Sequence, residues 1–318
     1  MPGTDSLALK RVLCATDFSD AAAAALDVAV ALARACKAEV RIVHVCAIPG
    51  HAGGGPPCTA HRPGIEEKSR AELIEALDRY GHSAIESGVT CGGVLSEGVP
   101  PEEIVRAAER GAADVIVMGP HSRGAADTWD LGSVTERVIR EAPCPVLVAR
   151  PFPPRRGDRP RHVTCGLDLR ETTARTLECA VAVANALEAD LLVLHVSAGE
   201  GAKGALDTLA AVVAKAGARS GHVQQQVVTG VPYQGILAAA HEHGSDLIVV
   251  GSHGGGVVER QFLGSTALRL LRHSPCSVLV VPARVSRARE CLPAERLPWE
   301  PPEAGPGAAF RLRSWREP

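Results

Sequence analysis

The sequence has few aromatic residues and no excess charge of either sign. Phe, Trp and Tyr make up 3% of its 318 residues, and 34 basic side chains are matched by 36 acidic ones, a formal net charge of -2. Nucleic-acid binding relies on a positive field and on rings that stack against bases. We therefore do not expect nucleic acid as a partner.

Long hydrophobic runs are also missing. A membrane-spanning helix needs about 20 consecutive apolar residues, and no stretch approaches that length. The N-terminal stretch is interrupted by Asp5, Lys10, Arg11 and Asp17, which does not fit a secretory leader. These features predict a cytoplasmic protein without a membrane partner.

The ten cysteines do not form a recognisable framework. They are scattered through apolar segments, with no CxxC pair and no spacing typical of zinc ligands. In a cytosolic protein such residues are small buried hydrophobes that stay reduced. We expect no metal site and no role for cysteine in function.

The sequence does contain enough apolar residues to form a buried core. Hydrophobic residues are 46% and charged residues 22%, both near the averages of globular proteins. At about 100 to 200 residues per domain, the length favours two domains.

An internal repeat supports that division. The segment RVLCATD at 11–17 recurs as HVTCGLD at 162–168, and RIVHV at 41–45 recurs within LLVLHV at 191–196. Asp17 and Asp168 are thus 151 residues apart, and so are the two histidines of the second pair. A repeated unit of this size predicts two copies of one fold.

Later segments of the two copies are 132 residues apart. They are GVP at 98–100 and 230–232, LGS at 131–133 and 263–265, and APCPVLV at 142–148 with SPCSVLV at 274–280. The difference of 19 residues between the two displacements indicates an inserted loop in the first copy, around AIPGHAGGGPPCTAHRPG at 47–64.

Each copy alternates short apolar runs with helical segments. VIVM at 115–118 and LIVV at 247–250 lack polar alternation, as expected for strands covered on both faces. Helices are predicted at 21–35, 101–111 and 173–187. The alternation predicts an α/β fold of two tandem doubly wound, Rossmann-like domains, each with a five-stranded parallel sheet.

The predicted boundaries follow from the repeat. Residues 1–151 form the first domain, 152–160 a Pro-rich linker, and 161–282 the second domain. Residues 283–318 lose all periodicity and are predicted to be a disordered, Arg-rich tail.

The loops after the fourth strands carry the strongest ligand signal. In the second copy, Gly251, two residues, Gly254, nine residues, then Gly264 and Ser265 precede a helix. Glycines let main-chain amides turn toward an anion, and a helix N-terminus adds further amides and a positive dipole end. The pattern predicts a phosphate site. In the first copy the same spacing holds for Gly119, Gly132 and Ser133, but Ser122 replaces the second glycine and Arg123 follows it.

These segments resemble the universal stress protein family. ATDFSD at 15–20, the HV pairs at His44 and His195, the GVP and LGS segments and GSHGG at 251–255 all look like that family, over about residues 10–150 and 161–282. The glycine pattern is similar to the ATP-binding signature of its ATP-binding branch. The second copy matches it in full, and the first misses one glycine.

The resemblance implies roles for individual residues. Asp17 and Asp168 match an acidic residue near the adenosine, and Val45 and Val196 match a valine that contacts adenine. The residues that match the phosphate and ribose loop are Gly119, Gly132 and Ser133 in the first copy and Gly251, Gly254, Gly264 and Ser265 in the second. The implied ligand is ATP, with Mg as its usual companion.

The resemblance also implies pairing through the last strands. PVLVAR at 145–150 and SVLVVP at 277–282 are similar to the strands through which family members pair, either between chains in a homodimer or within one chain as a pseudo-dimer. Members are usually regulatory or protective proteins rather than vigorous enzymes.

Other interpretations remain open from the residues alone. Asp17 and Asp168 could cap the helices that follow them. His44 and His195 fit hydrogen-bonded strand-end histidines better than catalytic ones. We predict no catalytic residue, because no nucleophile with a readable orienting partner is present. The two alternative functions are a nucleotide-free module that binds an unknown protein partner, and a slow nucleotide hydrolase that uses His121 or His253.

Overall fold

The computed structural model describes residues 9–47, 70–121, 131–151, 160–169, 173–197, 204–216, 223–253 and 263–283, and the backbone of 311–314. The predicted inserted loop at 47–64 and the predicted linker at 152–160 lie outside these residues, except for Ala47 and Pro160. We refer to residues 9–151 as the first half and to 160–283 as the second half.

Both halves repeat the same order of strands and helices. The first half contains β1 (Arg11–Ala15), α1 (Asp20–Cys36), β2 (Glu39–Ala47), α2 (Arg70–Glu86), β3 (Cys91–Gly98), α3 (Pro100–Arg110), β4 (Val115–Met118), α4 (Ser133–Glu141) and β5 (Val146–Val148). The second contains β6 (His162–Leu167), α5 (Thr173–Leu187), β7 (Asp190–Ser197), α6 (Ala205–Lys215), β8 (Val223–Thr229), α7 (Pro232–Glu242), β9 (Leu247–Gly251), α8 (Ser265–His273) and β10 (Ser277–Val281).

All strands belong to one sheet. Its order is β11-β3-β2-β1-β4-β5-β10-β9-β6-β7-β8, and within each half the five strands are parallel in the order 3-2-1-4-5. The strand order reverses between β1 and β4, and between β6 and β9. In open α/β sheets such a reversal opens a crevice at the carboxyl ends of the strands. The predicted pair of doubly wound domains is confirmed.

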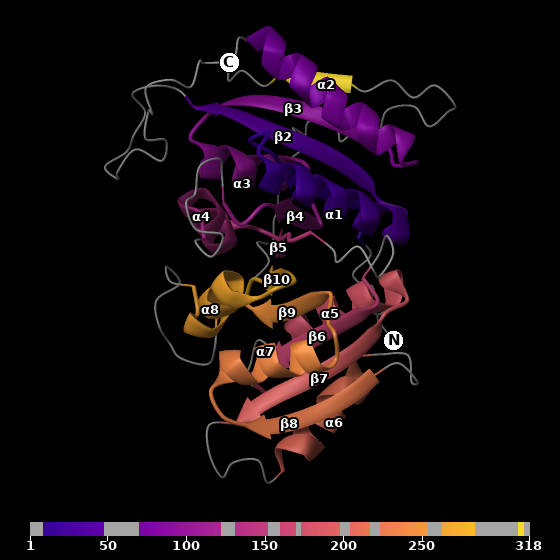
Figure 1. Cartoon of the computed structure of the whole chain (residues 1–318), viewed down its shortest axis with the longest axis vertical. Helices are drawn as coiled ribbons and strands as arrows, with labels where there is room; N and C mark the ends of the chain where they lie inside the picture. Colours follow the sequence, from indigo (N-terminus) through magenta and orange to yellow (C-terminus); the bar gives the residue numbers. More distant parts are fainter. Residues whose placement is uncertain are drawn as a thin grey trace.

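The helices cover both faces of this sheet. One apolar cluster gathers α1, α2, α5 and α6 on one face, and a second gathers α3, α4, α7 and α8 on the other. Each cluster contains residues of both halves. The interior is therefore continuous through the middle of the molecule, where Figure 1 shows β5 and β10 between the two sets of helices.

The junction between the halves is an antiparallel strand pair. Val148, Leu147 and Val146 of β5 lie opposite Val278, Leu279 and Val280 of β10. The main-chain nitrogen of Arg150 donates to the Ser277 hydroxyl at 3.0 Å, and its guanidinium donates to the Leu271 carbonyl at 3.2 Å. The last strands thus pair within one chain and join the two halves.

One carboxylate in each half ties the first strand to the fourth. Asp114 accepts hydrogen bonds from the main-chain nitrogens of Lys10 and Arg11, at 2.7 and 2.9 Å. Asp246 accepts the equivalent bonds from Arg161 and His162, at 2.8 and 3.2 Å. Both carboxylates are buried, so these bonds fix the start of the first strand in each half.

The tail differs from its prediction at four residues. Arg311–Ser314 form β11, which pairs in parallel with β3 and extends the sheet at that edge. The prediction of disorder is wrong for these four residues, because a short apolar and Arg-containing run can pair with an open strand edge whatever its flanks. The rest of 284–318 lies outside the described residues.

The described cysteines are free thiols. Six of the eight are buried, including Cys14, Cys91, Cys165 and Cys179. Burial raises the pKa of Cys91 and of Cys179 to about 12, so neither is a thiolate near neutral pH. Among the residues described, no helix is long and apolar enough to cross a membrane.

Candidate functional site

The loop after the first strand is built around an acidic residue in each half. Asp17 accepts hydrogen bonds from the Ser19 main-chain nitrogen at 3.0 Å and from its hydroxyl at 2.5 Å. The Ser19 hydroxyl in turn accepts from the Ala22 nitrogen and is the N-cap of α1. In the second half, Asp168 accepts from the hydroxyl of Thr173, the first residue of α5. The acids therefore hold the helix starts, but Ser19, not Asp17, caps α1.

The residue after each acid has a left-handed backbone. Phe18 has φ of 60° and Leu169 has φ of 56°, at equivalent positions of the repeat. Such a conformation costs about 1 kcal/mol for a residue other than glycine, so its presence in both halves indicates a backbone geometry imposed by the surrounding fold.

The strand-end histidines have the same partner in both halves. Nδ1 of His44 lies 2.8 Å from the Thr16 carbonyl, and Nδ1 of His195 lies 2.8 Å from the Leu167 carbonyl. Because a carbonyl only accepts, each Nδ1 donates, which fixes the tautomer of the neutral ring. The prediction of hydrogen-bonded strand-end histidines is confirmed.

In each half, the acid and the candidate adenine valine follow residues that are paired in the sheet. In the first half, Ala15 is the last residue of β1 and lies opposite Val43 of β2, and Asp17 and Val45 each come two residues later. In the second half Leu167 is the last residue of β6 and lies opposite His195, and Asp168 and Val196 are the next residues of the two segments. The repeat thus brings these predicted residues together at the same edge of the sheet.

The glycine loops after β4 and β9 are closed at the neck by one repeated hydrogen bond. The Gly132 nitrogen donates to the Pro120 carbonyl at 2.8 Å, and the Gly264 nitrogen donates to the Ser252 carbonyl at 2.8 Å. A side chain at Gly132 would place its Cβ 3.2 Å from the Cα of His121. Glycine therefore lets the two ends of the loop meet.

Gly119 brings the loop against α1. A Cβ on this residue would lie 3.0 Å from the main-chain carbon and oxygen of Ala21, in the first turn of α1. The Gly119 carbonyl also accepts from the hydroxyl of Thr135 in α4, at 3.0 Å. The start of α1, the end of β4 and the start of α4 thus meet at the reversal of strand order.

The helices that follow the loops begin without a side-chain cap. Gly132 is the N-cap of α4 and Gly264 the N-cap of α8, and neither makes a side-chain capping bond. Ser133 and Ser265, the first helical residues, are exposed. The first amides of a helix have no partner within it, so an anion is well placed to accept hydrogen bonds from them.

A buried carboxylate that the sequence did not reveal lies near Val45. Glu103 of α3 is buried, accepts a 2.6 Å hydrogen bond from the Ser96 hydroxyl, and forms an ion pair with Arg106. Ser96 lies opposite Val45 in the sheet. A Cβ on Gly98 would approach the Glu103 side chain to 2.9 Å, so the glycine admits the carboxylate.

The second half has no counterpart of this network. Val228, Gly235 and Ala238 occupy the positions of Ser96, Glu103 and Arg106, 132 residues further on. Gly235 lets α7 approach the sheet, since a Cβ there would lie 2.9 Å from Val196. The surroundings are therefore polar near Val45 in the first half and apolar near Val196 in the second half.

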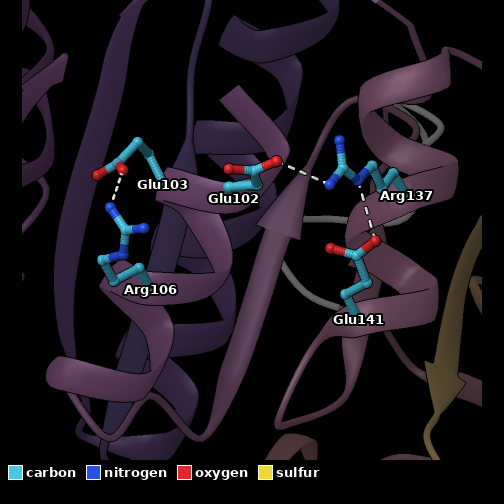
Figure 2. A network of polar contacts seen from close by, with 5 residues as sticks. All are labelled: Glu102, Glu103, Arg106, Arg137 and Glu141. Carbon is cyan, nitrogen blue, oxygen red and sulfur yellow. Dashed lines mark hydrogen bonds and ion pairs between the residues drawn. The ribbon is translucent and has the colours of Figure 1, made fainter. Parts of the chain in front are cut away.

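The contact between the last two helices differs in the same way. In the first half, Arg137 of α4 binds Glu102 of α3 at 2.8 Å and Glu141 of its own helix at 2.9 Å, as Figure 2 shows beside the Glu103–Arg106 pair. In the second half, the guanidinium of Arg269 lies over the Tyr233 ring, 4.8 Å from its centroid.

His253 lies two residues after the end of β9, at the start of the second glycine loop. His253 Nδ1 lies 2.8 Å from the Ser252 hydroxyl, and its buried Nε2 has no hydrogen-bond partner among the residues described. Ser252 is itself buried, which removes it as an accessible nucleophile. Three of the predicted loop residues, Ser122, Arg123 and Gly254, lie outside the described residues.

Together these features define a tandem protein of two Rossmann-like α/β units, each with a glycine-bounded loop and an uncapped helix start at the reversal of strand order. The family model "Universal stress protein family" matches residues 8–150 and 160–282. The chain therefore belongs to the universal stress protein family.

Individual relatives agree with this assignment. A universal stress protein of Methanocaldococcus jannaschii is 38% identical over 141 residues, 44% of this chain and 82% of the relative. One of Thermus aquaticus is 36% identical over 143 residues, 44% of this chain and 98% of the relative. Each relative thus has the length of one half.

A solved structure reproduces both halves at once. The universal stress protein of Archaeoglobus fulgidus DSM 4304 aligns with a TM-score of 0.67 at 23% identity, and covers 87% of this chain and 98% of that one. This likeness supports the tandem fold.

Proposed function

We propose that this protein binds an adenine nucleotide, ATP, at the carboxyl edge of its sheet and acts as a regulatory or protective protein of the cytosol. The observation that carries the proposal is the start of α8, which has no side-chain cap and lies at the end of the complete Gly251, Gly254, Gly264, Ser265 pattern. A phosphate group is the ligand that such a helix start favours, because its amides and its dipole both attract negative charge.

The neighbouring residues suit the rest of the nucleotide. Val196 is an apolar residue near the end of β7, 9% exposed, against which a base can pack. Asp168 directly follows β6, where a carboxylate can accept from ribose hydroxyls. The strands β7, β6 and β9 are neighbours in this order in the sheet. Their order matches that of the base, the sugar and the phosphate in a nucleotide. A triphosphate brings Mg with it, held by phosphate oxygens.

The first half carries the same arrangement with one substitution. Its loop neck, its uncapped helix start and its Asp17–Val45 pair match the second half, while Ser122 replaces a glycine and Arg123 adds a charge. We assign the triphosphate to the second half, and we propose that the first half binds the nucleotide more weakly.

Calorimetric titration of the full chain with MgATP tests the proposal. Ser265→Asp places a negative charge at the exposed first position of α8, where it repels phosphate and favours the helix dipole, so the fold tolerates it. We expect at least about tenfold weaker binding. Ser265→Asn has the same shape without the charge and is the matched control.

Two results would contradict the proposal. One is wild-type protein that takes up no ATP, and the other is equal binding by the Asp and Asn variants. The pair Ser133→Asp and Ser133→Asn reports on the first half in the same way. A larger loss at Ser133 than at Ser265 would reassign the main site to the first half.

The two alternatives make different demands. A nucleotide-free interaction module needs the tail. In that case, removal of 284–318 would abolish partner binding, and the full chain would bind no ATP. A hydrolase would release phosphate from ATP above the blank rate and lose that activity in His253→Ala. We propose binding without efficient turnover, because Ser252 next to His253 is buried.

A further inference from the structure

The two outer edges of the sheet differ in whether a further strand pairs with them. On the first half, β11 pairs with β3 and covers that edge with the chain's own C-terminal strand. On the second half, β8 pairs with β7 and, among the residues described, with no other strand. In Figure 1 the covered and the bare edges lie at opposite ends of the molecule.

The bare edge lacks the features by which proteins protect an edge strand. Natural edges are short, bulged, or carry charge or proline. β8 has seven residues, Val223–Thr229, with the sequence VQQQVVT, and contains no charged residue and no proline. Gln224 and Gln225 are exposed along it. An uncharged open strand of this length is a template for pairing with another strand.

Exposed apolar side chains border the same edge. Among the described residues, the exposed large hydrophobic side chains are those of Leu206, 52% exposed, and Val231, 46% exposed. Leu206 belongs to α6, which packs against β8, and Val231 follows β8 after one residue. Their positions indicate a surface around β8 that gains from being covered.

The direction of the main-chain groups on β8 follows from one hydrogen bond. The Gly230 nitrogen donates to the Ser197 carbonyl of β7 at 2.9 Å. Because the main-chain groups of alternate residues point to opposite sides of a strand, those of Val223, Gln225 and Val227 face away from β7. These are the groups that a further strand would meet.

The sequence of β8 identifies the strand that fits. Residues 223–227 read VQQQV, which is the same in both directions and is centred on Gln225. If two copies pair antiparallel about a twofold axis at Gln225, valine lies opposite valine and glutamine opposite glutamine at every position. The outward-facing residues Val223, Gln225 and Val227 then exchange main-chain hydrogen bonds across the axis.

We propose that β8 is a dimerisation edge, at which the β8 strands of two copies pair antiparallel about Gln225 and continue the sheet from one molecule into the next. The chain already joins its two halves in this way, since β5 and β10 are antiparallel neighbours. The proposed contact uses the opposite end of each second half and leaves the candidate nucleotide loops outside it.

Sedimentation equilibrium of the full chain over a range of concentrations tests the proposal. We expect the wild-type protein to reach a dimer. Gln225→Pro removes an outward-facing N–H without breaking a bond to β7, and we expect it to raise the dissociation constant at least about tenfold. Gln225→Thr keeps the N–H and is the matched control, expected to dimerise like the wild type.

A second variant covers the case in which the proline disturbs the fold. Gln225→Lys places two ammonium groups opposite each other at the axis, so it weakens the dimer at low salt and less at high salt. Gln234→Lys adds the same charge at an exposed position of α7 and is expected to leave the dimer unchanged.

Three results would overturn the proposal. The first is a wild-type chain that stays monomeric at every concentration, and the second is a dimer that Gln225→Pro and Gln225→Lys both leave intact. The third is a dimer that is lost when residues 284–318 are removed but not in the Gln225 variants. That outcome would assign the contact to the tail strand of a second copy.

Discussion

The two halves share their main-chain contacts and differ in the side chains that pack their last helices. The Asp114 and Asp246 bonds, the histidine–carbonyl bonds and the loop necks recur with closely similar distances. By contrast, within the described parts of the chain the buried Glu103 network and the Glu102–Arg137–Glu141 group belong to the first half alone. The repeat therefore preserves the hydrogen bonds that fix the strand ends and the loops, and it varies the side chains that surround them.

The two halves differ at the candidate nucleotide site and at the outer edges of the sheet, where a ligand or a partner would bind. In the first half a buried carboxylate, Glu103, accepts from Ser96, which lies opposite Val45, while in the second half Gly235 lets α7 approach Val196. One outer edge carries β11, and the other, β8, has no further strand among the residues that the structure describes. Two copies of one fold can therefore have different affinities for one nucleotide and different contacts with other molecules.

The largest expected effect comes from moving the buried acid into the second half. Gly235→Glu places a carboxylate where the first half has Glu103, but Val228 and Ala238 offer it no partner, and Val196 is too close for the new side chain. An unpaired buried charge costs about 3–5 kcal/mol. Urea denaturation followed by circular dichroism measures the loss.

The control for this variant restores the partners. Val228→Ser and Ala238→Arg, added to Gly235→Glu, recreate the three residues of the first half. We expect the triple variant to recover part of the lost stability, because packing against Val196 remains tight. If Gly235→Glu alone is as stable as the wild type, the two halves do not differ in packing as described.

The next effect tests what the halves share. Asp114→Ala and Asp246→Ala each remove a buried carboxylate that accepts two main-chain hydrogen bonds. Since bonds to charged acceptors contribute about 1.5–3 kcal/mol each, with some recovery by water, we expect a loss of about 3 kcal/mol in either variant. Chemical denaturation should give similar losses, and a large effect in one half alone would refute the equivalence.

The smallest effect concerns the first residues of β2 and β7. Burial raises the pKa of Glu39 to about 7 from 4.5, although Arg41 and Arg11 lower it. The folded protein thus holds this proton more tightly than the unfolded chain, so stability falls as pH rises from about 4.5 to about 7. Glu39→Gln should remove that fall and stabilise the protein at pH 8 by about 1 kcal/mol.

Asp190 provides the matched position in the second half. It lies opposite His162, as Glu39 lies opposite Arg11, but its side chain is 54% exposed. Asp190→Asn replaces a more exposed carboxylate at the same register position and is the comparison variant for the melting temperature across pH. Equal pH effects of the two variants would show that burial at Glu39 is not the cause.

Much of the fold could be predicted from the repeat and from hydrophobic runs. The helix predicted at 173–187 coincides with α5, and the strands begin at the repeated RVLCATD and HVTCGLD segments. Periodicity works here because the strands are covered on both faces and the helices bury one stripe. Family membership followed from motifs spread over both halves.

Other features could not be predicted, because they depend on contacts distant in sequence. Glu103 reads as a helix-start acid, and only the approach of α3 to Ser96 and Gly98 shows that it is buried. The left-handed Phe18 and Leu169 carry no glycine or asparagine signal. β11 was missed because the Pro- and Gly-rich composition around it outweighs a four-residue run.

The central claim is that phosphate is held by the uncapped start of a helix after the glycine loop, and a crystal structure of the full chain with ATP tests it most directly. We predict a phosphate oxygen within about 3 Å of main-chain nitrogens in the first turn of α8, with the base beside Val196. ATP bound away from both Gly264 and Gly132, or no nucleotide at saturating concentration, would contradict it.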